Sequence, residues 1–207
     1  MIRLLELYPE HLNLNGDRAN LLVLQRRLEW ASITVDRFTH RAGQPLPATR
    51  PDVVLLGHGS AAAWRQVYSD LARIVPELES WMAAGTQLLA VSSGFAALHG
   101  LMKSLPTSIE RRERISKFEV VETERGDVVG YLNSDLVLDP FMHEGNFIGT
   151  LLHGPVLAKT TWLADEMIEK ILIQKPEIVR SANEAKFELV ERFAAGASEL
   201  AKELARE

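Results

Sequence analysis

The sequence has no cysteine among its 207 residues, and this absence removes several kinds of chemistry at once. Without a thiol, the chain cannot form disulfides, hold a metal through thiolates or use a cysteine nucleophile. Proteins without disulfides are typical of reducing compartments, and the first residues lack the apolar segment of a signal peptide. We therefore expect a cytoplasmic protein.

Excess positive charge and long apolar runs are also missing. Lys and Arg together number 23 against 28 Asp and Glu, which gives a formal net charge of -5 at pH 7. Binding to nucleic acid usually needs a basic face, so we expect no nucleic-acid partner. No apolar run approaches the ~20 residues of a membrane-spanning helix, so we expect no membrane span. The six histidines do not follow the spacing of a metal motif, and we expect no metal site.

What the sequence does contain is an alternation of apolar strands and amphipathic helices. Hydrophobic residues make up 46% of the chain, which allows a sizeable core, and the length suits one domain over residues 1–207. The alternation predicts an α/β fold with a doubly wound, mostly parallel sheet that binds ligands beyond the carboxyl ends of its strands. The expected strands are 2–8, 32–35, 52–56, 87–91 and 147–152, and the expected helices follow an N-cap at Asp17, cover 61–75, run from Pro76 to about 85 and cover 161–173.

The region after Leu101 breaks this alternation. Residues 110–114 are all charged, and we expect a solvated loop there. Residues 118–122 and 128–132 are predicted to pair as a hairpin, with Arg125 at its exposed tip.

A last helical stretch is expected from Pro176 to the end of the chain. Phe187, Val190, Phe193 and Leu200 fall close to one stripe of that helix. Such a stripe either packs on the core or presents a surface to a second protein or a second copy, and the sequence leaves both alternatives open.

The most informative segment is Gln87–Leu98, in which an apolar strand turns into a helix through Ser92, Ser93 and Gly94. A sharp strand-to-helix turn raises one side chain above the sheet, beside free backbone N–H groups that stabilise a developing anion. Ser92 holds the position of the nucleophile in such an elbow. The alternative is structural, because two small residues also fit a tight turn.

Two further segments end at the same predicted edge of the sheet. The strand 52–56 is followed by Gly57, His58 and Gly59, and the strand 147–152 is followed by His153. His153 either acts as a base for Ser92 or holds a loop by hydrogen bonds. The His58 side chain either crowds the site or points to solvent.

Three longer stretches match one family together. They are Leu7–Asn20, which begins Leu-Tyr-Pro, then Val53–Gly59, and Gly149–Asp165, which contains Leu-Leu-His-Gly-Pro. This set resembles the glutamine amidotransferase subunits of lipid II isoglutaminyl synthases, in the cobyric-acid-synthase-like branch of class I glutamine amidotransferases. The resemblance covers the chain from Leu7 to about Ile168 and implies the flavodoxin-like fold of class I glutamine amidotransferases.

The departures from the family lie at its catalytic centre. Ser92 stands where the family has its nucleophilic cysteine, and Ser93 and Ala96 also differ from the family pattern Cys-Gly-Gly-Tyr-Gln. Pro155 stands where many class I enzymes have the glutamate that orients the catalytic histidine. The resemblance therefore implies a relic or weak dyad of Ser92 and His153.

The same resemblance implies the groups that would surround a substrate. Gly57, His58, Gly59, Ser93 and Gly94 would form the oxyanion and substrate loop, with His58 replacing a family glycine. The family's Asn-His-Gly-Gly substrate loop is not found between residues 130 and 144.

The implied function is a subunit of a cell-wall complex that amidates the D-glutamate of lipid II. Its partner would be a Mur-ligase-like, ATP-dependent subunit, and the chain itself would need no cofactor. A serine without an orienting acid is a weak nucleophile, so we expect a degenerate subunit without glutaminase activity. The alternatives are an active enzyme that binds and hydrolyses glutamine, or a serine hydrolase, both using Ser92 and His153.

Overall fold

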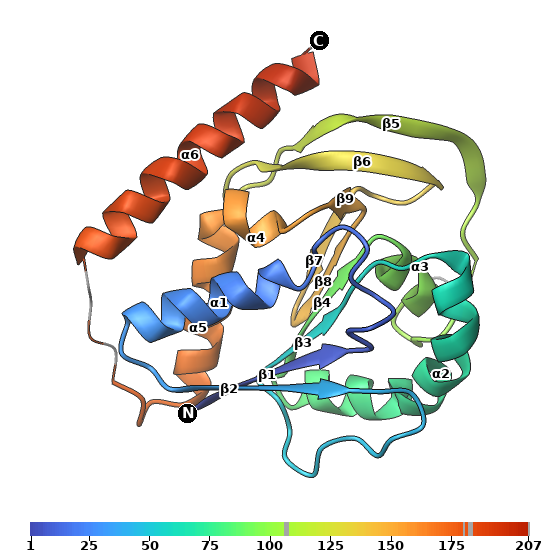
Figure 1. Cartoon of the computed structure of the whole chain (residues 1–207), viewed down its shortest axis with the longest axis horizontal. Coiled ribbons are helices and arrows are strands. Elements are labelled where there is room, and N and C mark those ends of the chain that lie inside the picture. The colour runs from blue at the N-terminus through green and yellow to red at the C-terminus, as the bar shows by residue number, and fades with distance from the viewer. Residues whose placement is uncertain (106–107, 180, 182–183, 207) are drawn as a thin grey trace.

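The computed structural model describes residues 1–105, 108–179, 181 and 184–206, and its centre is a six-stranded sheet in the order β2-β1-β3-β4-β8-β7 (Figure 1). Strands β2, β1, β3, β4 and β8 are parallel, and β7 pairs antiparallel with β8 at the edge. The predicted doubly wound, mostly parallel α/β fold is confirmed. The bounds of these strands are β1 Ile2–Leu7, β2 Val35–His40, β3 Val53–Leu56, β4 Gln87–Val91, β7 Phe141–Glu144 and β8 Phe147–Thr150.

Helices cover both faces of this sheet (Figure 1). Strands β3, β4 and β8 are buried along their whole length, which is why they read as unbroken apolar runs. The helix bounds are α1 Ala19–Trp30, α2 Ala61–Ala83, α3 Ser93–His99, α4 Val156–Lys159, α5 Thr161–Gln174 and α6 Glu184–Arg206. None of the helices in the described ranges is long and apolar enough to cross a membrane.

The expected break at Pro76 is wrong, because α2 runs through this proline without interruption. Proline inside a helix costs about 3 kcal/mol, since it removes one hydrogen bond and crowds the preceding turn. Leu71, Ile74 and Leu78 are each about 1% exposed or less, and their burial against the sheet outweighs that cost.

Two expectations near the N-terminus are also wrong. Strand β2 covers Val35–His40 rather than residues 32–35, because its parallel pairing with β1 starts at Val35 opposite Ile2. Asp17 is not the N-cap of α1: Arg18 holds that position and its side chain makes no cap bond. The Asp17 carboxylate is used elsewhere, at the candidate site.

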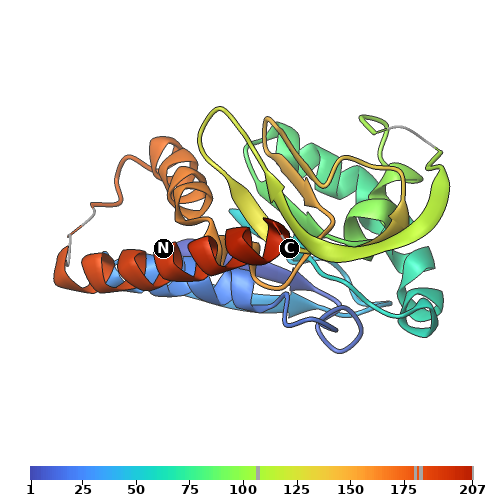
Figure 2. The same ribbon diagram turned by 90° about the horizontal axis from the view of Figure 1, so that it is seen from above.

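The expected solvated loop at 110–114 is wrong as well. Strand β5 (Arg111–Val121) includes most of it and pairs antiparallel with β6 (Val128–Leu136), so the hairpin is longer than predicted. The predicted pairing at its closed end is confirmed, with Val121 opposite Val128. β5 is mostly exposed and so lacks the apolar alternation of a core strand. Figure 2 shows this hairpin curving over one side of the molecule.

A second sheet has three strands, in the order β5-β6-β9. It brings the hairpin close to the carboxyl ends of the parallel strands, where Ser92 lies. Strand β9 (Leu152–His153) pairs with β6, with His153 opposite Tyr131. The expected single strand over 147–152 is therefore divided between two sheets after Thr150.

The last helix starts later than predicted. Residues 177–179 are not helical, and α6 begins at Glu184; residues 180, 182 and 183 lie outside the described part of the chain. The expected single apolar stripe is wrong too. Phe187 and Val190 are half-buried, whereas Phe193 is 67% exposed and Leu200 58%. Each step of three residues turns the helix about 60° short of a full circle, and two such steps separate Phe187 from Phe193. The two side chains therefore lie about 120° apart, on different faces of the helix.

Candidate functional site

Ser92 lies in a strained turn between β4 and α3. Its backbone has φ 50° and ψ -113°, a conformation that residues other than glycine rarely adopt. The Ser92 N–H donates a hydrogen bond of 2.6 Å to the Thr150 carbonyl of β8, which holds the turn against the neighbouring strand. The geometry is that of a nucleophile elbow at the carboxyl edge of the sheet.

Gly94 allows this turn to lie tight against β3. A Cβ atom at Gly94 would come within 2.6 Å of the Gly57 carbonyl oxygen and 2.7 Å of the Leu56 carbonyl oxygen. Only a residue without a side chain fits there. The close approach places the segment 57–59 directly beside the elbow.

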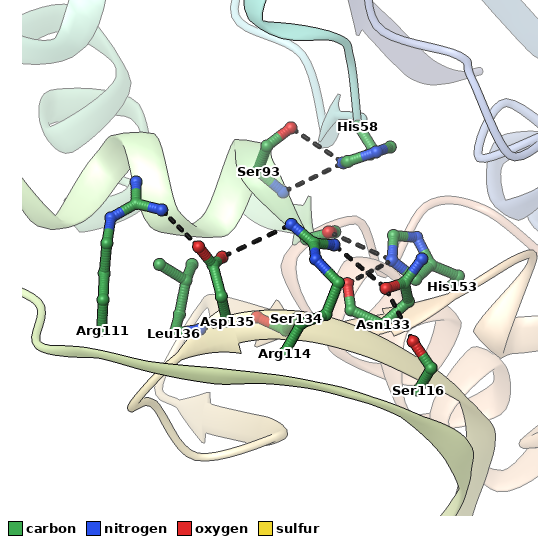
Figure 3. A network of polar contacts seen from close by, with 11 residues as sticks. His58, Ser93, Arg111, Arg114, Ser116, Asn133, Ser134, Asp135, Leu136 and His153 are labelled. Carbon is green, nitrogen blue, oxygen red and sulfur yellow. Dashed lines mark hydrogen bonds and ion pairs between the residues drawn. The ribbon is translucent and has the colours of Figure 1, made fainter.

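His153 lies across from Ser92, with its Nε2 atom 3.5 Å from the Ser92 Oγ atom. Its other ring nitrogen, Nδ1, is 2.6 Å from the Asn15 side-chain nitrogen. Nε2 is also 3.3 Å from the Asn133 carbonyl oxygen (Figure 3). The Asn15 amide thus orients this histidine, at which the sequence predicted no orienting acid.

These partners determine which nitrogen of His153 carries the proton. Burial is the main cause that lowers the pKa of the His153 imidazole and Arg114 lowers it further, while the hydrogen bond to Asn133 raises it, so the ring is neutral at pH 7. A carbonyl oxygen only accepts, so the bond to Asn133 requires hydrogen on Nε2. Nδ1 then accepts from the Asn15 amide. In this tautomer, the nitrogen nearest Ser92 has no lone pair with which to take its proton.

His58 lies inside the site and contacts the residue after Ser92. Its Nδ1 atom is 2.9 Å from the Ser93 Oγ atom and accepts from the Ser93 backbone N–H at 3.3 Å (Figure 3). Burial, followed by His153 and Arg114, lowers the pKa of His58 to about 4, so the ring is neutral at pH 7, and the hydrogen bond from the Ser93 N–H requires the lone pair to be on Nδ1. The backbone N–H that follows the nucleophile in an elbow is an oxyanion-hole donor. Here His58 occupies it.

The second backbone donor of the loop is engaged as well. The Gly59 N–H donates to the Ser93 Oγ atom at 3.1 Å, and the Trp64 indole N–H donates to the same oxygen at 2.7 Å. The two backbone N–H groups that would face an oxyanion, those of Ser93 and Gly59, therefore bond to the side chains of His58 and Ser93.

Asp17 fixes the His58 loop from behind. Its Oδ2 atom accepts the His58 backbone N–H at 2.7 Å, and the carboxyl group is fully buried. Burial raises the pKa of Asp17 to about 6, and the hydrogen bond from His58 opposes this rise.

A pocket of about 570 Å³ opens beside Ser92 and is roofed by the β5–β6 hairpin. Its far wall is charged: Arg111 lies 2.5 Å from Asp135, and Arg114 lies 3.0 Å from the Asn133 side chain and 3.7 Å from Asp135 (Figure 3). Sequence reasoning missed these residues because the segment 110–114 looked like a solvated loop. Apolar walls come from Trp64 and Tyr68 of α2.

The fold is the flavodoxin-like fold of class I glutamine amidotransferases. A glutamine amidotransferase structure from Thermotoga maritima covers 99% of this chain and 95% of its own, with a TM-score of 0.50 and 15% identity. The structure of PurLQS from Thermotoga maritima gives a TM-score of 0.50 and 15% identity, over 84% of this chain and 98% of that one.

Among proteins of assigned function, the chain is similar to the lipid II isoglutaminyl synthase (glutamine-hydrolyzing) subunit GatD of Staphylococcus aureus (strain N315). The two are 24% identical over 201 residues, which covers 80% of this chain and 82% of that subunit. No protein-family model matches this chain.

Proposed function

We propose that this chain is a single-domain, glutamine amidotransferase-like subunit of a cytoplasmic complex that amidates the D-glutamate of lipid II, and that it does not hydrolyse glutamine. The similarity to the Staphylococcus aureus subunit supports the role in amidation. The partner would be a Mur-ligase-like subunit that binds ATP, and this chain would contribute its fold and surface. Ser92 and His153 are then remnants of a nucleophile and its base.

One observation supports the proposed loss of activity: the side chains of His58 and Ser93 occupy the N–H groups of the oxyanion hole. The Ser93 N–H bonds to His58, and the Gly59 N–H bonds to the Ser93 hydroxyl. Removing a single oxyanion donor from a hydrolase reduces kcat by about 10²–10³. Here two donors are engaged, and the attacking group is a hydroxyl rather than a thiolate.

Glutamate release from glutamine by the purified chain tests this proposal. We expect none from the wild type and little from Ser92→Cys alone. Ser92→Cys combined with His58→Gly frees the Ser93 N–H and should release glutamate at least about tenfold faster than Ser92→Cys. The combination of Ser92→Cys with His11→Gly is the matched control, because the His11 side chain bonds to Gln66 and is not among the residues that line the pocket. Glutamate release by the wild type that disappears in Ser92→Ala would contradict the proposal.

The second candidate is an active enzyme, an amidotransferase or a serine hydrolase, using Ser92 and His153. The contact between Asn15 and His153 favours it, because an asparagine orients the histidine in papain-like proteases. That role requires the Asn15 amide turned over, so that Nδ1 donates and Nε2 faces Ser92 with a lone pair. Covalent labelling by a fluorophosphonate that Ser92→Ala removes would support this candidate.

A further inference from the structure

Helix α6 has two faces with different environments. One face packs against β5, β6, α4 and α1. There the Phe187 ring lies edge-on to Trp30 with centroids 6.0 Å apart, and the Arg27 guanidinium lies 5.4 Å from the Phe187 centroid. At the other end, Lys202 pairs with Asp127 at 2.9 Å. These contacts fix the orientation of the helix along the side of the molecule, as Figures 1 and 2 show.

The outer face carries four large apolar side chains. We name it the α6 stripe, made of Leu189 (48% exposed), Phe193 (67%), Leu200 (58%) and Leu204 (38%). Gly196 lies between them, and a Cβ atom there would meet no described atom within 4 Å. Exposed apolar residues that follow one another along a helix mark a contact surface more often than scattered ones do.

The spacing of the α6 stripe is symmetric about its centre. The intervals are four residues from Leu189 to Phe193, seven from Phe193 to Leu200 and four from Leu200 to Leu204. An antiparallel second copy would therefore place Leu189 against Leu204 and Phe193 against Leu200 on both sides of a two-fold axis. Gly196 lies next to that axis, where its missing side chain lets the two helices approach closely.

The charges along the edge of the stripe favour the same arrangement. Arg192 flanks one half, where its guanidinium lies 5.6 Å from the Phe193 centroid, and Glu199 and Glu203 flank the other half on the same edge. An antiparallel two-fold brings each edge against itself in reverse, so Arg192 of one copy faces Glu199 and Glu203 of the other. A parallel arrangement would bring this edge against the opposite one and lose these pairs.

We propose that the α6 stripe is a self-association surface, on which a second copy of this chain binds through its own α6 in antiparallel orientation. The contact is isologous, because each copy contributes the same four apolar side chains and the same charged edge. This inference does not depend on the chemistry of Ser92 and goes beyond the proposed function.

Sedimentation of the full chain over a wide range of concentration tests the proposal. We expect a concentration-dependent dimer of twice 23.1 kDa. Phe193→Asp should raise the dissociation constant at least about tenfold. Ile173→Asp is the matched control, because Ile173 is 78% exposed on α5, outside the stripe, and that variant should dimerise like the wild type. A monomer at every concentration, or a dimer that Phe193→Asp leaves intact, would overturn the proposal.

Charge exchange tests the orientation and keeps the hydrophobic stripe intact. Arg192→Glu and Glu203→Arg should each weaken the dimer, and the double variant should restore it. Both residues are exposed, so unfolding is not expected, and circular dichroism checks it. A double variant weaker than both single variants would contradict the antiparallel contact.

The lack of cysteine provides a further, independent readout. Under mild oxidation, Gly196→Cys should form a disulfide-linked dimer, because this residue lies next to its own copy at the axis. Leu189→Cys should not, because its neighbour is Leu204 of the second copy. Efficient cross-linking of Leu189→Cys to itself would indicate a parallel contact and refute the proposal.

Discussion

Asp17 shows how one buried carboxyl group connects the site to stability. Among the described residues, burial and the hydrogen bond from His58 are the two causes that shift its pKa, and its Oδ1 atom has no hydrogen-bond partner. Asp17 holds the His58 backbone in place, but its buried charge lowers the stability of the folded protein whenever the carboxyl group is ionised.

The pH dependence of this cost has a definite sign. Burial raises the pKa of Asp17 to about 6, above its ordinary value of 3.8. A raised acid pKa stabilises the folded protein at low pH, and this contribution is lost as the pH rises from about 4 to about 6. We expect Asp17→Asn to flatten the dependence and to gain about 1–2 kcal/mol over the wild type at pH 7.

The measurement is urea unfolding of both proteins at pH 4 and pH 7. Asp36→Asn is the matched control, because Asp36 is exposed on β2 and should leave the pH dependence unchanged. A difference between the wild type and Asp17→Asn that is the same at both pH values would contradict this assignment.

At the residue scale, the sequence located the elbow but not its hydrogen bonds. Ser92, Ser93, His58 and His153 follow strand ends, so their proximity followed from the parallel sheet. The role of Asn133 could not be predicted, because it acts on His153 through its backbone carbonyl, which is the same in every residue. The contact of Asn15 with His153 could not be predicted either, because 138 positions separate the two residues in the sequence.

Elements were predicted best where they are fully buried. The strands β3 and β4 match their predicted ranges closely, because their apolar runs have no solvent-facing side. The β5–β6 hairpin was predicted too short, because the first residues of β5 are exposed and no buried face imposes alternation on them. Helix α6 was predicted with one stripe because the residues of its two apolar faces alternate along the sequence.

The intact helix α2 offers a test of how burial overrides local preference. Pro76 is exposed, so replacing it removes no packing, and Pro76→Ala restores a backbone donor toward the Ala72 carbonyl. The greater freedom of the unfolded chain offsets part of the gain, by roughly 0.4–1 kcal/mol. We expect a net stabilisation of about 2–3 kcal/mol, seen as a higher urea midpoint.

Ser80→Ala, at another exposed position of α2, serves as the control and should change stability by less than about 0.5 kcal/mol. An unchanged or lower midpoint for Pro76→Ala would mean that the helix is already bent to satisfy the Ala72 carbonyl in another way.

For the whole molecule, the fold is that of an enzyme family, whereas the hydrogen bonds of the candidate site do not favour catalysis. The fold is that of class I glutamine amidotransferases, while the Ser93 N–H and hydroxyl groups at the elbow bond to the His58 side chain. The fold was predictable because it depends on the many residues that form the sheet. The closure of the oxyanion hole depends on the side-chain geometry of His58 and Ser93, which no sequence pattern specifies.

A complex whose amidotransferase subunit does not hydrolyse glutamine has to take its ammonia from solution. We therefore expect that this chain, combined with a purified Mur-ligase-like subunit, ATP and lipid II, supports amidation with an added ammonium salt and not with glutamine. The glutamine-hydrolysing Staphylococcus aureus enzyme is the positive control. Mass spectrometry of the lipid II product measures the outcome. Amidation from glutamine alone that Ser92→Ala abolishes would show that the elbow still works inside the complex, with His58 displaced from the Ser93 N–H by the partner.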